Sequence, residues 1–221
     1  MINMDLNERI LEQKDWAIVV FLFAMVLIAI VKTNFENRFY DFVRLFWSNK
    51  YVKIYKDGAL IMSWFTVILF FVQLISLSFF IQLILHVYDV VSKNDWIVFI
   101  QIFTILLIFV LSKYLIEKIV ANIFDIEEQV DMYNMTKVSY RTFITMVLLP
   151  VNVFLFYNNN DSIVLIFCII VIIAIFNVLT YVKTIKTYQN LVKRNLIYFI
   201  LYLCTLEIAP YFFVYYWFTN K

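Results

Sequence analysis

The stretch ALIMSWFTVILFFVQLISLSFFIQLILHVY, residues 59–88, contains no Asp, Glu, Lys or Arg. An uncharged apolar run of about 18 residues or more is typical of a transmembrane helix. As a helix, these 30 residues reach about 45 Å, whereas the hydrocarbon core of a bilayer is about 30 Å thick. The stretch therefore predicts a membrane helix that is strongly tilted or projects from the bilayer.

The rest of the chain has the same character. Of its 221 residues, 64% are hydrophobic and 15% are charged, and the mean hydropathy is +0.86. Soluble domains are about 45–50% apolar and about 25% charged, so a water-soluble fold is not expected. We expect one integral membrane domain over residues 1–221, all-α, with six transmembrane helices arranged as three hairpins. The expected spans are 16–31, 59–88, 96–112, 141–157, 162–182 and 196–218.

Residue types that carry chemistry are scarce. Gly58 is the only glycine, so phosphate-cradling loops and dinucleotide-binding fingerprints are excluded. There is one histidine, His86, and both cysteines, Cys168 and Cys204, fall inside expected spans, so a zinc or haem site is not expected. The net charge of +2 gives no basis for nucleic-acid binding. We therefore expect no metal, no cofactor, no catalytic residues and no enzyme activity.

Lys and Arg gather in alternate loops. The connections after the first, third and fifth spans hold 14 of the 18 basic residues. Short cytoplasmic loops of membrane proteins are enriched in these residues. The odd-numbered spans also each begin with a capping aspartate: Asp15, Asp95 and Asp161. We expect the three basic loops in the cytoplasm and both termini on the outer side of the membrane.

Two of the cytoplasmic loops contain helical apolar faces. In the first loop the face consists of Phe39, Phe42, Val43, Phe46 and Trp47. Arg38 and Arg44 lie away from it, which predicts a basic amphipathic helix in the inner interface. In the third loop the face consists of Ile116, Ile119, Val120, Ile123 and Phe124. The first face is either an interfacial connector or a surface for a protein partner. The acidic stretch that follows the second face, residues 125–131, is either a solvated face or a contact for a basic protein partner. Nearby Lys113 and Glu117 are spaced to pair.

Glu207 is the one acidic residue deep inside an expected span. A charge at the centre of a membrane helix costs at least ~2.5 kcal/mol, so this carboxyl group is a candidate protonatable group. Pro150 and Pro210 are candidate hinges, because proline interrupts helical hydrogen bonding. Other polar residues are expected at similar depth: Gln73, Gln101, Thr104, Asn152 and Asn177. These groups can lock the helices together, hold an ion or proton, or bind a lipid or small molecule.

The second expected span has a polar stripe along its outer half. Its members recur at i, i+4, i+8 and i+11, on one helical face: Ser78, Gln82, His86 and Asp89. The stripe indicates either a wet or protein-packed outer groove or the polar end of a helix that reaches into the membrane interface.

Two stretches of the chain carry a family resemblance. They are the last span, above all LCTLEIAP at Leu203–Pro210, and residues 14–55, with KDWAIVVFLFAMVLIAIVK and FVRLFWSNKYVKIY. They resemble a family of uncharacterised polytopic inner-membrane proteins of Bacteroidota that has only a domain-of-unknown-function label. The resemblance implies that the Asp15–Trp16 entry, the Ser48–Tyr51 turn and the Glu207/Pro210 pair are family features. It implies an inner-membrane location but does not suggest a particular activity.

Together these patterns predict a non-enzymatic inner-membrane subunit or accessory factor of a cell-envelope or secretion assembly. Its expected partners are the lipid bilayer and either another membrane protein or further copies of itself. The alternative is a small proton-coupled or lipid-handling transporter that uses Glu207 as its protonatable group.

Overall fold

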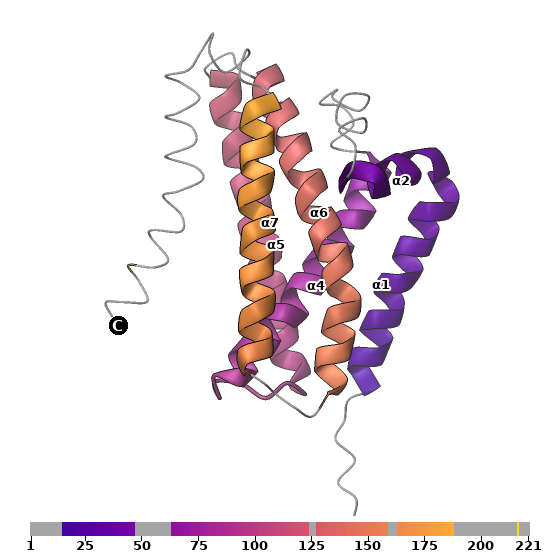
Figure 1. The fold of residues 1–221 in the computed structure, drawn as a ribbon, viewed down its shortest axis with the longest axis vertical. Helices are drawn as coiled ribbons and strands as arrows, with labels where there is room; N and C mark the ends of the chain where they lie inside the picture. Colours follow the sequence, from indigo (N-terminus) through magenta and orange to yellow (C-terminus); the bar gives the residue numbers. More distant parts are fainter. Residues whose placement is uncertain (1–14, 47–62, 124–126, 159–162, 188–215, 217–221) are drawn as a thin grey trace, which may run out of the picture.

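The computed structural model describes residues 15–46, 63–123, 127–158, 163–187 and Tyr216 (Figure 1). Within these ranges the regular elements are all helices. They are α1 (Asp15–Asn34), α2 (Glu36–Val43), the 3-10 turn η1 (Arg44–Phe46), α4 (Trp64–Val87), α5 (Trp96–Ile123), α6 (Glu127–Tyr157) and α7 (Ile163–Thr187). Five of them, α1, α4, α5, α6 and α7, are long and apolar enough to cross a membrane. The expected all-α fold is confirmed, and the helices are consistent with a multi-pass membrane protein.

The five long helices lie at the first five expected spans, with different ends. α5 begins at Trp96 as expected but continues to Ile123, and α6 begins at Glu127, well before the expected residue 141. The third loop is thus largely a continuation of these two helices rather than a separate amphipathic helix. The first loop does hold separate short helices, α2 and η1. The sixth expected span, the second half of the third hairpin, lies outside the described residues apart from Tyr216.

The α4 helix lies in the middle of the bundle. It packs against α1, α5 and α6, and 61% of its span is buried, compared with 6% for α5 and 6% for α7. The α6 helix packs against α4 and also against α7, which lies in front of α5 in Figure 1. The interior is therefore built mainly from α4 and α6, while α5 and α7 present most of their surface to the surroundings.

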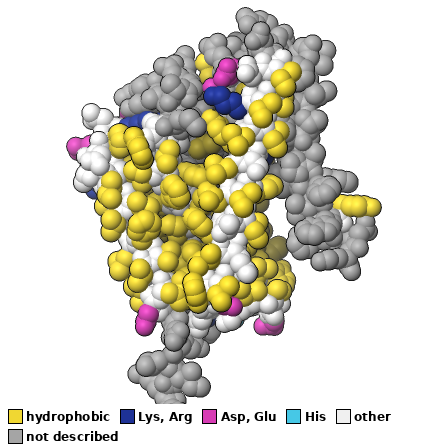
Figure 2. Space-filling model, turned by 180° about the vertical axis from the view of Figure 1, so that it is seen from behind, with side chains coloured by type: hydrophobic (Ala, Val, Ile, Leu, Met, Phe, Trp, Pro, Cys, Tyr) yellow, Lys and Arg dark blue, Asp and Glu magenta, His cyan; other side chains and the backbone are white. Residues whose placement is uncertain are grey.

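The two ends of the bundle differ in charge. The acidic end carries Asp15, Asp89 and Asp95, with Lys93 as the one Lys or Arg among its described residues. The basic end carries the other described Lys and Arg side chains, such as Arg38, Lys113 and Lys137, together with acidic ones such as Asp41 and Glu117. Figure 2 shows hydrophobic side chains over the middle of one face, with Lys and Arg as well as Asp or Glu toward the upper end and Asp or Glu along the lower end. An apolar band between two polar ends is the surface that a bilayer requires of a membrane protein.

Aromatic rings hold the helices together near the acidic end. The rings of Phe21 in α1 and Phe79 in α4 stack with their centroids 4.1 Å apart, and the Phe79 and Phe99 centroids are 4.5 Å apart. Trp16 and Phe156 also contact the Phe79 ring. Aromatic pairs of this geometry contribute about 0.5–1.5 kcal/mol each beyond the area they bury. The cluster fixes how four helices meet at this end.

A second core near the basic end fixes α2 against the bundle. Phe42 and Leu45 are buried there against Phe65 and Leu69 of α4. The sequence pattern placed Arg38 away from the apolar face of this loop, but the side chain is buried. Its Nη1 donates to Ser63 Oγ at 2.8 Å, and its guanidinium carbon lies 4.5 Å from the centroid of the Phe65 ring. A planar guanidinium can stack and donate hydrogen bonds at once, and periodicity cannot foresee this.

Candidate functional site: a buried polar seam between α4 and α6

Polar side chains meet in the interior along the contact between α4 and α6. Thr142 Oγ1 donates to Gln73 Oε1 at 2.9 Å, and both residues are buried. Ser76 Oγ donates to the carbonyl of Thr145 at 2.9 Å. Asn152 Nδ2 donates to the Ser76 carbonyl at 2.7 Å and lies 3.2 Å from Ser76 Oγ. We call these five residues the polar seam.

The helical register explains why these five residues face one another. Gln73 and Ser76 are three residues apart on α4, and Thr142 and Thr145 are three apart on α6, so each pair lies on one face of its helix. In a membrane, interhelical hydrogen bonds of this kind contribute about 0.6–1.7 kcal/mol each. The side chains are amides and hydroxyls, which do not titrate, so the seam as described positions helices rather than transferring protons.

Pro150 interrupts α6 next to the seam. It lies inside the helix and has no N–H, so the carbonyl of Met146 loses its usual helical donor there. The bonds from Ser76 to Thr145 and from Asn152 to Ser76 lie on either side of this interruption. The seam therefore holds the parts of α6 before and after Pro150 to the same helix, α4. Within the described residues, Asn152 Oδ1 is buried and has no hydrogen-bond partner, which leaves an acceptor beside the interruption.

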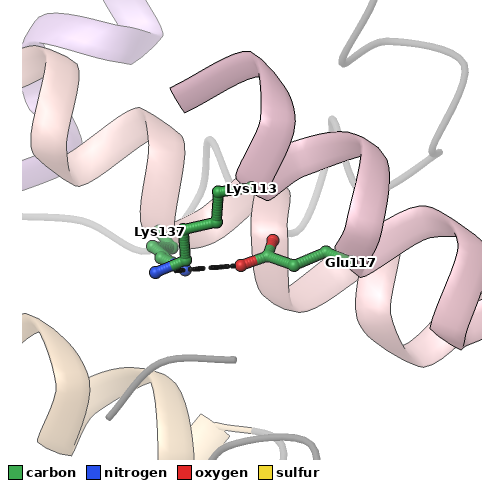
Figure 3. A network of polar contacts seen from close by, with 3 residues as sticks. All are labelled: Lys113, Glu117 and Lys137. Atoms are coloured by element: carbon green, nitrogen blue, oxygen red, sulfur yellow. Dashed lines mark hydrogen bonds and ion pairs between the residues drawn. The ribbon is translucent and has the colours of Figure 1, made fainter. Parts of the chain in front are cut away.

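A cluster of charges lies between α5 and α6 nearer the basic end (Figure 3). Glu117 Oε1 is 3.5 Å from Lys137 Nζ and 3.9 Å from Lys113 Nζ. The Glu117 and Lys137 side chains are only 5% and 9% exposed. Glu117 lies about 32 Å along α5 from Trp96, so in a bilayer the cluster lies near one boundary of the ~30 Å hydrocarbon core.

The sequence pattern identified only part of this cluster. The spacing of Lys113 and Glu117 predicted their pairing, and the structure confirms it. Lys137 was not foreseen, because it lies on the next helix and no spacing rule relates it to Glu117. The signal available in the sequence was a lysine among the uncharged polar residues Asn134, Thr136 and Ser139.

The outer polar stripe of α4 joins that helix to the loop after it. Gln82 Nε2 donates to the carbonyls of Lys93 and Asp95 at 3.2 and 2.9 Å, and His86 Nδ1 lies 3.1 Å from the carbonyl of Val91. Ser78 donates to the Leu74 carbonyl within α4. Asp89 is exposed, with a backbone φ of 55°, where the chain leaves the helix. Gln82 and His86 thus hold the α4–α5 connection.

The expected midplane residues do not form one network in the described part of the chain. Gln73 and Asn152 belong to the polar seam. Gln101 and Thr104 are exposed on α5, and Thr104 donates to the Ile100 carbonyl of its own helix. Asn177 donates to the Ile173 carbonyl within α7, and Pro150 is exposed. Glu207 and Pro210 lie outside the described residues.

Ligand sets for a metal were sought among the described residues. No group of three or more His, Cys, Asp or Glu side chains is arranged there to hold a metal ion. Cys168 is exposed on α7 as a free thiol, and Cys204 lies outside the described residues. Buried polar groups such as Gln73, Asn152 and Gln82 instead connect one helix to another or to a loop.

Comparison with known proteins gives one match. A family model described as Domain of unknown function (DUF4271) matches residues 17–218. No curated protein and no solved structure matches the chain. The resemblance to an uncharacterised family is therefore confirmed over nearly the whole chain.

Proposed function

The chain belongs to the family of the Domain of unknown function (DUF4271), and from that premise we propose that it is a non-enzymatic integral membrane subunit or accessory factor. It acts by binding a protein partner in a cell-envelope or secretion assembly of the bacterial inner membrane. Two features support the proposal: the packed interior of the helix bundle and an exposed apolar surface.

The interior supports a scaffold rather than a reaction chamber. The seam residues Gln73, Ser76 and Asn152 are buried and bonded between helices α4 and α6. Aromatic rings and aliphatic side chains fill the space on either side of them. Polar groups that bind one another in a packed interior stabilise one arrangement of the helices, which is what a partner-binding scaffold needs.

The single observation that carries the proposal is the apolar end of α5. This helix has 28 residues and reaches about 42 Å, so its last turns extend beyond a ~30 Å hydrocarbon core. In these turns Ile119 and Ile123 are 59% and 72% exposed, one turn after Ile116, which is 47% exposed. Apolar surface that lies outside the bilayer and stays uncovered marks a site of protein interaction.

The experiment compares the mass of the assembly for two matched double variants. The tagged protein is purified at native expression in mild detergent, and the mass of the intact particle is measured. An isoleucine buried by a partner contributes about 1.5–3 kcal/mol, so Ile119→Ser with Ile123→Ser is expected to weaken association at least about a hundredfold. The partner mass is then lost.

The control changes exposed polar residues beside the isoleucines at the same helix end. Lys118 and Asn122 are exposed there, and Lys118 pairs with the exposed Glu127 at 3.6 Å. Lys118→Ser with Asn122→Ser is expected to keep the partner, because exposed ion pairs contribute little. A partner that survives both double variants contradicts the proposed surface.

A lone particle in the same measurement would favour the transporter alternative. That function needs a protonatable group at the midplane, and its candidate, Glu207, lies outside the described residues. The described seam supports it less, because its groups do not titrate and are bonded to one another.

A further inference from the structure

A groove of about 310 Å³ lies between α6 and α7 on the outside of the bundle. Its walls are aliphatic and aromatic side chains, apart from the Thr180 hydroxyl and the phenol of Tyr140. Thr180 and Tyr140 mark the end of the groove that is nearer the basic end of the bundle. The groove thus has an apolar body, because Tyr140 is buried and the Thr180 hydroxyl donates to the Phe176 carbonyl. Its mouth is polar through Arg141, the residue after Tyr140 on α6.

The length of the groove corresponds to one leaflet of a bilayer. On α6 its lining runs from Tyr140 to Val151, and on α7 from Ile169 to Thr180. Each run rises about 16 Å, roughly half of the ~30 Å hydrocarbon thickness. A lipid tail that enters at the polar mouth therefore finds apolar walls along most of its length.

Positive charge continues the groove face toward the basic end. On α6 the residues Lys137, Arg141, Ile144, Leu148 and Val151 recur at i, i+4, i+7, i+11 and i+14. This spacing places them on one helical face. Ile144, Leu148 and Val151 line the groove, while Arg141 is partly exposed and Lys137 lies in the ion cluster with Lys113 and Glu117. The cluster contains two lysines and one carboxylate, so its net charge is positive.

We propose that this groove binds an anionic phospholipid, with one acyl chain between α6 and α7 and the phosphate beside Arg141. Basic pockets between membrane helices recognise anionic headgroups in this way. The positive charge at its mouth suits the phosphate, and the length of its apolar body suits an acyl chain. The bound lipid fills the gap between α6 and α7 and so supports the position of α7.

The first test measures headgroup preference. The protein alone is purified in detergent, titrated with phosphatidylglycerol or phosphatidylcholine, and analysed by native mass spectrometry. A basic residue near an anionic group contributes ~1 kcal/mol, so Arg141→Gln is expected to lower phosphatidylglycerol affinity about fivefold. Phosphatidylcholine binding stays unchanged. Lys32→Gln removes an exposed charge at the same end on α1 and is expected to keep the preference.

The second test fills the groove. Val147 lines it and is 55% exposed, so Val147→Trp places an indole in the groove without overpacking the core. Val178 on α7 is 60% exposed and lies outside the lining, so Val178→Trp is the matched control. Val147→Trp is expected to reduce the retention of both lipids, and Val178→Trp to leave both unchanged.

Three outcomes overturn the proposal. Equal affinity for the two lipids in the unchanged protein removes the headgroup site. If the particle has twice the mass of the chain, and Val147→Trp but not Val178→Trp reduces it to the mass of a monomer, a second copy covers the groove. Efficient cross-linking of Val147→Cys to Cys204, in a Cys168→Ser background, shows that the chain's own segment 196–218 fills it.

Discussion

The carboxylate of Glu117 is held between two ammonium groups in a largely water-free part of the bundle. Its Oε1 is 3.5 Å from Lys137 Nζ and 3.9 Å from Lys113 Nζ. Removing charges from water is expensive, and a buried ion pair recovers that cost only through close, well-placed partners. Here the single carboxylate separates two like charges, so the cluster depends on it more than on either lysine.

Glu117→Ala is therefore expected to be strongly destabilising. Loss of one partner from a buried ion pair typically costs about 3–5 kcal/mol, because the other charge stays buried. The measurement is the free energy of unfolding in mixed micelles titrated with SDS. The control is Glu127→Ala, since Glu127 is 49% exposed and its pair with Lys118 is expected to contribute no more than about 1 kcal/mol. Equal losses in the two variants would mean that the cluster is not buried as described.

At the scale of elements, the α4–α6 pair depends on hydrogen bonds as well as on shape. Lipid tails are as apolar as the side chains of these helices, so burial alone gives little preference for one helix contact over another. The polar seam supplies that preference, because Asn152 donates to α4 whereas Asn177 of α7 donates to the carbonyl of Ile173 in its own helix. Two asparagines in membrane helices thus have different roles.

Asn152→Leu is expected to weaken the contact between α4 and α6. The bonds to Ser76 are lost, at a cost of about 0.6–1.7 kcal/mol. Asn177→Leu removes an amide of the same size from α7 and is expected to change stability by less than about 0.5 kcal/mol. Both free energies of unfolding come from the same SDS titration. A larger loss for Asn177→Leu than for Asn152→Leu would refute the assignment of the seam.

At the scale of the whole molecule, the charge difference between the two ends predicts an orientation. The positive-inside rule places the basic end, with α2, in the cytoplasm, and the α4–α5 loop in the periplasm. Asn37 of α2 and Asp89 of that loop are both exposed, at opposite ends of the bundle.

Single cysteines test this orientation. In a chain with Cys168→Ser and Cys204→Ser, Asp89→Cys is expected to react with a membrane-impermeant maleimide in intact spheroplasts. Asn37→Cys is expected to react only after lysis. The yield of labelled protein is measured by its mass shift. Labelling of Asn37→Cys before lysis, with protection of Asp89→Cys, would reverse the orientation.

Local rules predicted much of the fold and little of the candidate site. Hydropathy along the chain located the first five spans, and the cap rule identified Asp95, whose Oδ1 accepts the Ile97 N–H at 3.0 Å. Spacing also identified Lys113 with Glu117. It did not identify Lys137 or the burial of Arg38, because each depends on a helix that is distant in the sequence.

What the sequence by itself determined is the class of protein, the positions of its first five long helices and the difference in charge between its ends. These are properties of short stretches of chain, and length and hydropathy are enough to specify them. What only the tertiary structure decided is which helix is central and which polar residues meet. The membrane-spanning parts of α4 and α5 are almost equally apolar, yet 61% of one and 6% of the other are buried. The physical reason is that lipid and protein interior are equally apolar, so hydropathy cannot tell a helix that faces its neighbours from one that faces the membrane.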